Sequence, residues 1–325
     1  MRPRDLFHWK THVYGGMLPA LRGLGPERAD AALDALGRLS AAVNPARRAL
    51  LRNALRRARV SLGTDWQDDA LVPALSAGML RFQARDYLLD TRDDAQALAR
   101  FDVKGGELVD AAAQAGRGLI VVGAHYGAHL AAFHWLFRRH IPLRVMVQRP
   151  RHISRALGRF FEEGGPDPQS AFFLTRGLGP ADCVERLLRV RAALRSGKAV
   201  YFAGDIPWTG PNTRAGHLLG QRHSFLSVWA DLSALTGAPV VTAFCNHRPG
   251  GRFSLQFQPQ GTVPRGGENA AVADSLTRLE SAIAADPCDA VAHLLWPCYG
   301  PPCPAAAAAN LPSRPGRRRA AVLAP

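Results

Sequence analysis

The sequence contains no run of about twenty apolar residues, which is the length that a transmembrane helix needs. Its first residues also lack the long apolar segment that follows the basic start of a secretory signal peptide. The sequence therefore predicts neither a membrane span nor a signal peptide, and we expect any contact with a membrane to be peripheral.

Paired cysteines are missing as well. The chain has five cysteines, an odd number, and none forms a C-x-x-C pair. Cys183 and Cys245 lie among apolar residues and are predicted to be small core side chains. Cys298 and Cys303 flank a proline-rich turn without further metal ligands. We therefore expect a reducing compartment and no metal site.

Acidic residues are few in relation to basic ones. The chain has 41 Lys and Arg against 26 Asp and Glu, for a formal net charge of +15 at pH 7. Such a charge favours anionic partners such as nucleic acid, anionic lipid or a phosphorylated carrier. No zinc finger, helix-turn-helix signature or interleaved aromatic and basic pattern occurs, so we do not expect nucleic acid to be the partner.

Residues 27–100 are predicted to be helical, because apolar residues recur at spacings of three and four. The segment 45–62 also carries six arginines. The favoured interpretation is a solvated basic face beside a stripe of leucines. The alternative is a basic amphipathic helix that rests on an anionic membrane. The stripe consists of Leu50, Leu51 and Leu55.

Beyond residue 117 short apolar runs alternate with helical patterns. This alternation predicts an α/β fold with a mainly parallel central sheet covered by helices, preceded by the N-terminal helical region. The strict alternation of residues 252–259 predicts an edge or half-exposed strand. Ser224 is expected to cap a helix that ends at Gly237. The expected strands are 118–125, 143–148, 199–205, 238–245 and 252–259, and the expected helices after the first strand are 127–139, 181–197, 224–237 and 274–286.

The hydrophobic pattern and the composition divide the chain into three parts. We expect residues 1–100 to form a helical N-terminal region that packs on the core, and residues 101–300 to form the α/β core. Residues 301–325 are rich in proline and alanine and lack periodicity, which predicts a disordered basic tail.

The most informative histidine follows the first of these apolar runs. His125 comes directly after "LIVVGA" and stands just before the expected helix at residue 127. Ligands of open α/β sheets bind where strands end, so His125 is a candidate general base. The amides that open the helix could hold a developing oxyanion. A single histidine at the end of a strand more often has a structural role than a catalytic one.

Two more strand ends carry polar groups. The run 143–148 ends in "VQRP", which places Gln148 and Arg149 at the rim of the sheet, and the run 199–205 ends at Asp205. Two interpretations are equally favoured. Either these groups belong to one site, or Gln148 and Arg149 lie in an exposed turn and Asp205 caps a loop.

The order of these blocks resembles a known family. Residues 47–296 contain "RRALLRNALRRARVSL", "GRGLIVVGAHYGAHLAAF", "VMVQRP", "GKAVYFAGDIPWTG" and "LLGQRHSFLSVWADLSALTGAPVVTAFC" in that sequence. This succession is similar to the bacterial lipid A acyltransferases, the lauroyl and myristoyl transferases of lipopolysaccharide synthesis. The resemblance implies a fold like that of glycerolipid acyltransferases, and it covers about three quarters of the chain.

The resemblance also implies an activity. Members of this family move a fatty acyl group from a thioester, on acyl carrier protein or coenzyme A, to a hydroxyl of a lipid or glycolipid. For this chain the acceptor group would be a hydroxyl or an amine, with no cofactor beyond the thioester co-substrate. His125 would be the base, and Arg149, beside Gln148, would contact the carrier phosphate or the oxyanion, with Arg176 as a weaker candidate. The expected location is cytoplasmic, at the inner face of the bacterial inner membrane.

One position departs from the family pattern of His, four residues, then Asp or Glu. The fifth residue after His125 is Leu130, and no acidic residue occurs between Asp110 and Glu162. Three interpretations stay open: Asp205 orients His125, His129 forms a weaker dyad with it, or the chain is an inactive lipid-binding descendant. We favour a divergent transferase over the inactive protein.

Overall fold

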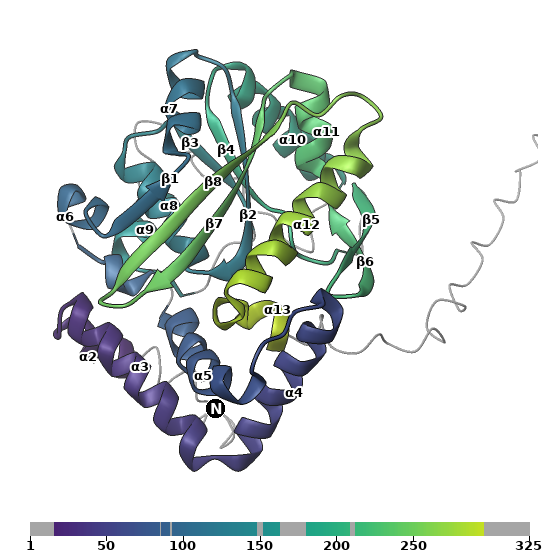
Figure 1. Ribbon diagram of the computed structural model, residues 1–325. Coiled ribbons are helices and arrows are strands. Elements are labelled where there is room, and N and C mark those ends of the chain that lie inside the picture. The colour runs from purple at the N-terminus through teal and green to yellow at the C-terminus, as the bar shows by residue number, and fades with distance from the viewer. Residues whose placement is uncertain are drawn as a thin grey trace, which may run out of the picture.

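The computed structural model describes residues 16–84, 86–91, 93–147, 152–162, 180–208 and 212–295. A twisted six-stranded sheet forms the centre, and a helical N-terminal part lies at one end of it (Figure 1). The predicted α/β class, with a mainly parallel sheet and an N-terminal helical region, is confirmed. No helix in the described ranges is long and apolar enough to cross a bilayer.

The N-terminal part is a set of helices whose ends agree closely with the pattern in the sequence. Asn44 caps α4, and its side-chain oxygen accepts a hydrogen bond from the Arg47 N–H at 2.9 Å. Gly63 ends the same helix in the left-handed conformation, at φ 63°. The helices are α2 (Leu18–Arg22), α3 (Pro26–Val43), α4 (Pro45–Leu62) and α5 (Asp68–Ala84), followed by the 3-10 turn η3 (Tyr87–Leu89) and α6 (Asp94–Leu98).

The central sheet has the strand order β1-β8-β7-β2-β4-β3. Among its described strands only β7 and β8 pair antiparallel, and the other neighbours run parallel. Strands β2 and β4, which lie side by side, therefore present their carboxyl ends at the same edge. The strands are β1 (Phe101–Lys104), β2 (Leu119–Gly127), β3 (Leu143–Met146), β4 (Ala199–Ala203), β7 (Val240–Arg248) and β8 (Arg252–Gly261).

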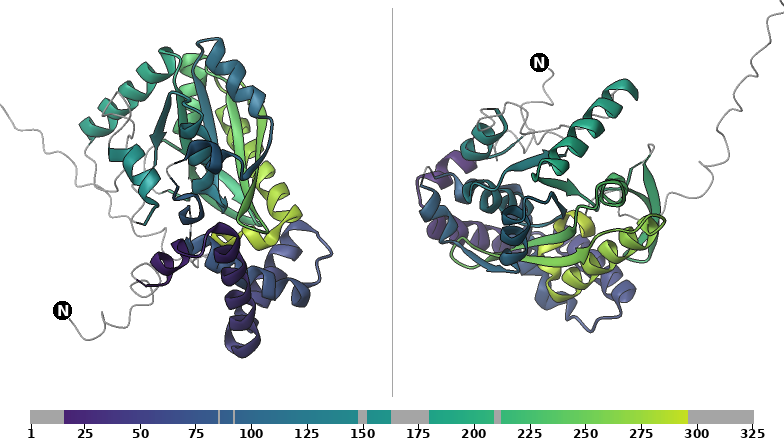
Figure 2. Two further views of the ribbon diagram at one scale, coloured as in Figure 1. Left: turned by 90° about the vertical axis from the view of Figure 1, so that its left-hand side faces the viewer. Right: turned by 90° about the horizontal axis from the view of Figure 1, so that it is seen from above.

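Helices cover both faces of this sheet, as the turned views in Figure 2 show. Successive residues of β2 enter separate cores: Ile120 and Val122 join one, while Leu119 and Val121 join the other. Burial on both faces explains why β2 is a continuous apolar run rather than an alternating one. One core includes α10 (Pro180–Arg195), α11 (Val228–Thr236) and α12 (Glu268–Ala285), and the other includes α7 (Gly106–Gln114), α8 (His129–Arg138) and α9 (Arg155–Glu162).

The strand predicted at 252–259 is confirmed as half-exposed, because β8 alternates in burial. It lies inside the sheet rather than at its edge, since β1 pairs with its outer side. Ser224 is not a helix cap: it lies in β6 (Gln221–Leu226), and α11 begins only after Ser227. The hairpin of β6 with β5 (Thr213–Leu218) was not predicted. Its two-residue turn consists of Leu219 and Gly220, and both have positive φ, as in a type I′ turn.

The last described elements are the 3-10 turn η4 (Pro287–Asp289) and helix α13 (Val291–Leu295). Helix α13 packs against β2 and against α4 and α5 of the N-terminal part. It therefore lies between the sheet and the N-terminal helices (Figure 1). The expected division at residues 100 and 300 stays a prediction, and the tail 301–325 lies outside the described residues.

Candidate active site

His125 lies near the end of β2, where the strand leaves its regular register. Strand β2 was expected to end at His125, but it continues to Gly127, with a register break against β7 between Gly123 and Gly127. Gly127 has φ 53°, and a Cβ there would lie 2.3 Å from the Cys245 carbonyl oxygen. Glycine is thus required where the chain turns into α8. Helix α8 begins at His129 and not at residue 127.

Asp205 follows β4 and meets His125 across the sheet edge. The Asp205 Oδ1 lies 3.1 Å from the His125 Nδ1, and its Oδ2 accepts a hydrogen bond from the His125 backbone N–H at 2.8 Å. A carboxylate only accepts, so the facing Nδ1 carries the hydrogen and Nε2 is the basic nitrogen of the ring. The His125 side chain is 21% exposed, whereas that of Asp205 is buried.

A second histidine, His293 of α13, also contacts this carboxylate. Its Nε2 lies 2.9 Å from the Asp205 Oδ2, and its side chain is fully buried. His293 was not predicted from the sequence, because a single histidine in the apolar stretch "AVAHLL" carries no pattern that sets it apart from a core residue.

The electrostatics of the site favour an ionised Asp205. Burial by itself raises the pKa of Asp205, but the charges and hydrogen bonds of His125 and His293 more than offset it, and the pKa lies well below its usual range. Tyr201 lies nearby in β4, and burial followed by the charge of Asp205 raises its pKa well above the usual value. Its hydroxyl occupies the space over Gly123, where a Cβ would lie 1.5 Å from the oxygen.

His129 and Leu130 have separate environments. The His129 ring lies beside that of His125, with centroids 4.9 Å apart, and beside Phe82 of α5 at 5.4 Å. Leu130 is 3% exposed and belongs to the core that includes α8. The position that is acidic in the family pattern is therefore part of the hydrophobic core here, and the carboxylate that meets His125 comes from the segment that follows β4.

The remaining candidate residues are Gln148, Arg149 and Arg176, and all three lie outside the described residues. Within the ranges that the structure describes, no group of three or more His, Cys, Asp or Glu side chains could hold a metal ion.

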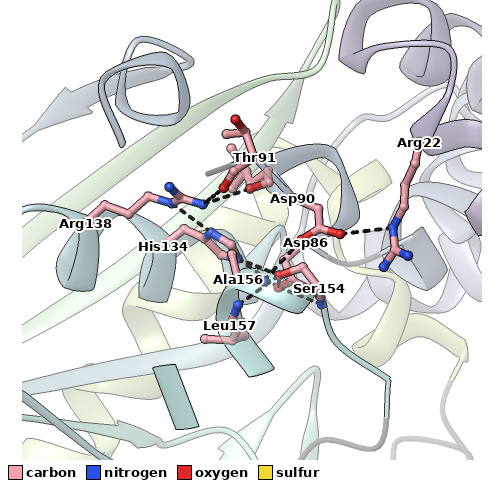
Figure 3. Close-up of polar contacts among 10 residues, drawn as sticks. Arg22, Asp86, Asp90, Thr91, His134, Arg138, Ser154, Ala156 and Leu157 are labelled. Atoms are coloured by element: carbon pink, nitrogen blue, oxygen red, sulfur yellow. Dashed lines mark hydrogen bonds and ion pairs between the residues drawn. The ribbon is translucent and has the colours of Figure 1, made fainter. Parts of the chain in front are cut away.

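A second polar cluster contains serine, histidine and aspartate but does not have the geometry of a catalytic triad. In a triad the histidine stands between the serine and the carboxylate, with one ring nitrogen on each. Here the Ser154 hydroxyl donates directly to Asp86, and the same His134 Nε2 lies 2.8 Å from Asp86 and 3.2 Å from Ser154 (Figure 3). Arg138 donates to the His134 Nδ1 at 3.3 Å.

All three members of this cluster are buried, with exposed fractions of 0 or 1%. Asp86 also accepts hydrogen bonds from the Ser154 backbone N–H, at 3.1 and 3.2 Å. The cluster therefore joins the segment after α5 to α8 and to the start of α9, and its role is structural.

The comparison with known families agrees with the resemblance seen in the sequence. The family model described as "Bacterial lipid A biosynthesis acyltransferase" matches residues 2–291. No curated protein matches the chain.

Proposed function

Because the chain belongs to the bacterial lipid A biosynthesis acyltransferase family, we propose that it moves a fatty acyl group from a thioester to a lipid or glycolipid. Family membership supports an acyltransferase in general. The finer proposal is that the donor is acyl-acyl carrier protein or acyl-coenzyme A, and that the accepting group is a hydroxyl or an amine. The observation that carries it is the contact between His125 and Asp205.

In the proposed reaction the His125 Nε2 takes the proton of the acceptor hydroxyl or amine. The acceptor oxygen or nitrogen attacks the thioester carbonyl carbon and forms a tetrahedral oxyanion. Collapse of this intermediate breaks the C–S bond, and the His125 imidazolium returns the proton to the leaving sulfur. The products are the acylated acceptor and a free thiol, so that atoms and charge balance.

Asp205 has two functions in this scheme. It holds the His125 ring in the tautomer whose Nε2 can accept a proton, and its negative charge stabilises the imidazolium that forms. Both functions require an ionised carboxylate, and the lowered pKa of Asp205 supports this state at neutral pH. The amides at the start of α8, together with Arg149, are proposed to hold the oxyanion or the carrier phosphate. Gln148 and Arg176 are proposed to support the same contacts.

An inactive lipid-binding protein is the alternative function. Only Leu130 favours it, because this residue cannot orient an imidazole. The position of Asp205 favours the transferase, since it supplies a buried carboxylate at 3.1 Å from the ring.

The proposed acceptor is a lipid, and the surface of the N-terminal helices offers a place for an anionic membrane. The turn between α3 and α4 projects away from the sheet (Figure 1). Large apolar side chains around this turn are exposed, and exposed arginines follow them on α4. Protruding apolar side chains beside basic ones fit an anionic lipid surface, as at the cytoplasmic face of the inner membrane. The residues are Leu36, Leu39, Val43 and Leu50, with Arg48, Arg56 and Arg57.

The proposed activity is tested by release of free thiol from acyl-coenzyme A and acyl-acyl carrier protein in the presence of a lipid A-type glycolipid. We expect thiol release by the wild type, and His125→Ala should reduce it by at least about 10³-fold, because the reaction loses its base. Unchanged turnover in His125→Ala would show that the site is assigned wrongly. Absence of thiol release with either donor, together with tight binding of acyl chains, would favour the inactive alternative.

A further inference from the structure

We infer that His293 is a positioning residue: it holds the Asp205 carboxylate in the orientation that serves His125. Family membership does not carry this inference, which comes from the contacts around Asp205. It rests on the proposed function in so far as His125 is the base.

The two oxygens of Asp205 have different tasks. Oδ2 accepts the His125 backbone N–H at 2.8 Å and faces the His293 Nε2 at 2.9 Å. Oδ1 faces the His125 Nδ1 at 3.1 Å. The two donors on Oδ2 fix the rotation of the carboxylate about its Cβ–Cγ bond. Oδ1 is thereby directed at the imidazole, and a rotation of the group would break contacts on both oxygens.

The chemistry of the donor also suits this task. Asp205 is buried and ionised, so its charge needs hydrogen bonds from the protein. A lysine or arginine in place of His293 would bring a permanent positive charge, which would oppose the formation of the His125 imidazolium. A histidine N–H donates to one carboxylate oxygen, at 2.9 Å, and leaves the other oxygen on the His125 ring.

The position of His293 is set by packing. Helix α13 packs against β2, α4 and α5. Just before it, the Asp289 Oδ2 accepts a hydrogen bond from the backbone N–H of His247 in β7 at 2.9 Å. These contacts hold the helix against the sheet edge at which β2 and β4 end. A donor on a packed helix orients the carboxylate more narrowly than the segment after β4 could by itself.

Two variants separate the donor from the bulk of the side chain. The amide nitrogen of glutamine can occupy the place of the histidine Nε2, whereas that of asparagine corresponds to Nδ1 and does not reach Oδ2. We expect His293→Asn to lower kcat for thiol release by about 10- to 100-fold with KM changed by less than about threefold. His293→Gln should recover kcat to within about fivefold of the wild type.

A spectroscopic measurement reads the same contact without turnover. A proton on the His125 Nδ1 that is held by a carboxylate gives a low-field imidazole resonance, which is assigned by its loss in His125→Ala. We expect this resonance to persist in His293→Gln and to disappear or move upfield in His293→Asn.

His134 provides the matched control. Its Nε2 also lies on a buried carboxylate, that of Asp86, at 2.8 Å. His134→Gln and His134→Asn should leave kcat and the His125 resonance as in the wild type, even where they lower the free energy of unfolding. Such a result would support the inference, because loss of a buried histidine donor elsewhere would not reproduce the effect.

Several outcomes would overturn the inference. They are an unchanged kcat and resonance in His293→Asn, an equal loss in His293→Gln, or an equal loss in His134→Asn. Failure of the proposed function has a different signature, because thiol release would then be absent in the wild type or unaffected by His125→Ala. In that case the resonance still decides whether His293 orients Asp205: its loss in His293→Asn supports the inference, and its persistence there refutes it.

Discussion

At the scale of the residue, the environment of Asp205 explains how His125 can be oriented although residue 130 is a leucine. The carboxylate contacts both the ring and the backbone N–H of His125. Its pKa is far below the usual value, because the histidine contacts outweigh the effect of burial. The Asp205 carboxylate, although distant in the sequence, therefore lies where it can orient the His125 imidazole.

Asp205→Asn tests this contact. The amide can donate to the Nδ1 of His125 and would then favour the tautomer with the proton on Nε2, which cannot act as a base. We expect kcat for thiol release to fall by about 10³- to 10⁴-fold, and by at least as much as in His129→Ala. Steady-state kinetics measure the effect, with the exposed Asp102→Asn as a control that should match the wild type. A loss below about tenfold would contradict the orienting role.

Asp289 gives a prediction about stability and pH. Burial, and then the charge of Asp286, raise the pKa of Asp289 to about 7 from the ordinary value of 3.8. Between these two values the unfolded chain has lost the proton while the folded chain keeps it. This group therefore lowers the free energy of unfolding as pH rises, by up to about 1.4 kcal/mol per pH unit. His247 acts oppositely, because burial lowers its pKa to about 3 from 6.5.

Asp289→Asn should remove the contribution of Asp289 to the pH dependence of the free energy of unfolding and leave that of His247. Relative to the wild type, its free energy of unfolding should rise steadily as pH increases from about 4 to 7, since the decrease that Asp289 causes over this range is then absent. Urea unfolding at several pH values in this window measures the difference. A difference between variant and wild type that stays constant across the window would refute a raised pKa at Asp289.

At the scale of the element, the cluster of Asp86, His134 and Ser154 holds three segments together. Asp86 precedes η3, His134 belongs to α8, and Ser154 stands just before α9. Arg138 extends the connection by donating to the carbonyl oxygens of Leu89 and Thr91, at 3.1 and 2.7 Å. Every member has partners inside the protein, as burial of such polar groups requires.

His134→Leu should therefore lower the free energy of unfolding by about 3 to 5 kcal/mol, because it leaves the buried Asp86 carboxylate without one of its donors. Chemical denaturation measures the loss. The exposed His217→Leu in β5 should change stability by less than about 0.5 kcal/mol. Thiol release per folded molecule should stay at the wild-type level in both variants, and a specific loss of kcat in His134→Leu would assign the cluster to the active site.

At the scale of the whole molecule, the N-terminal helices pack against the end of the sheet at which β2 and β4 terminate. Phe82 of α5 contacts His129, and α13 packs against both α4 and α5. The turn between α3 and α4 lies on the far side of these helices from the sheet (Figure 1). A membrane at this turn would thus approach the molecule from the end at which β2 and β4 present their polar side chains.

The exposed turn can be tested with vesicles. We expect the wild type to bind vesicles that contain anionic phosphatidylglycerol and to release them as salt increases. Leu39→Glu combined with Leu50→Glu should weaken binding by at least about tenfold, because both side chains are exposed, at 58% each. Leu235→Glu, at 57% exposure on α11, is the control, because α11 lies at the opposite end of the molecule from this turn (Figure 1). Co-sedimentation measures binding, and equal losses in the two variants would place the lipid surface elsewhere.

Much of the fold was predictable because local patterns carry it. Residues 27–100 were expected to be helical from the spacing of their apolar residues, and α3, α4 and α5 occupy most of this range. Proline, Asn44 and Gly63 mark the ends of α4 chemically. Strand β1 and the hairpin β5–β6 were not expected. Four residues are too few for a clear period in β1, and the hairpin lies in a stretch whose glycines and polar residues are typical of a loop.

His125 and Asp205 could be proposed from the sequence because each follows a recognisable strand, and parallel strands bring their ends to one edge. The sequence alone determined the α/β class and the likeness to the acyltransferases. Tertiary structure decided which carboxylate meets His125 and added His293, a residue 168 positions further along the chain than His125. The reason is physical: periodicity reports the burial of neighbours in the chain, whereas a hydrogen bond between distant elements depends on how the sheet and helices pack.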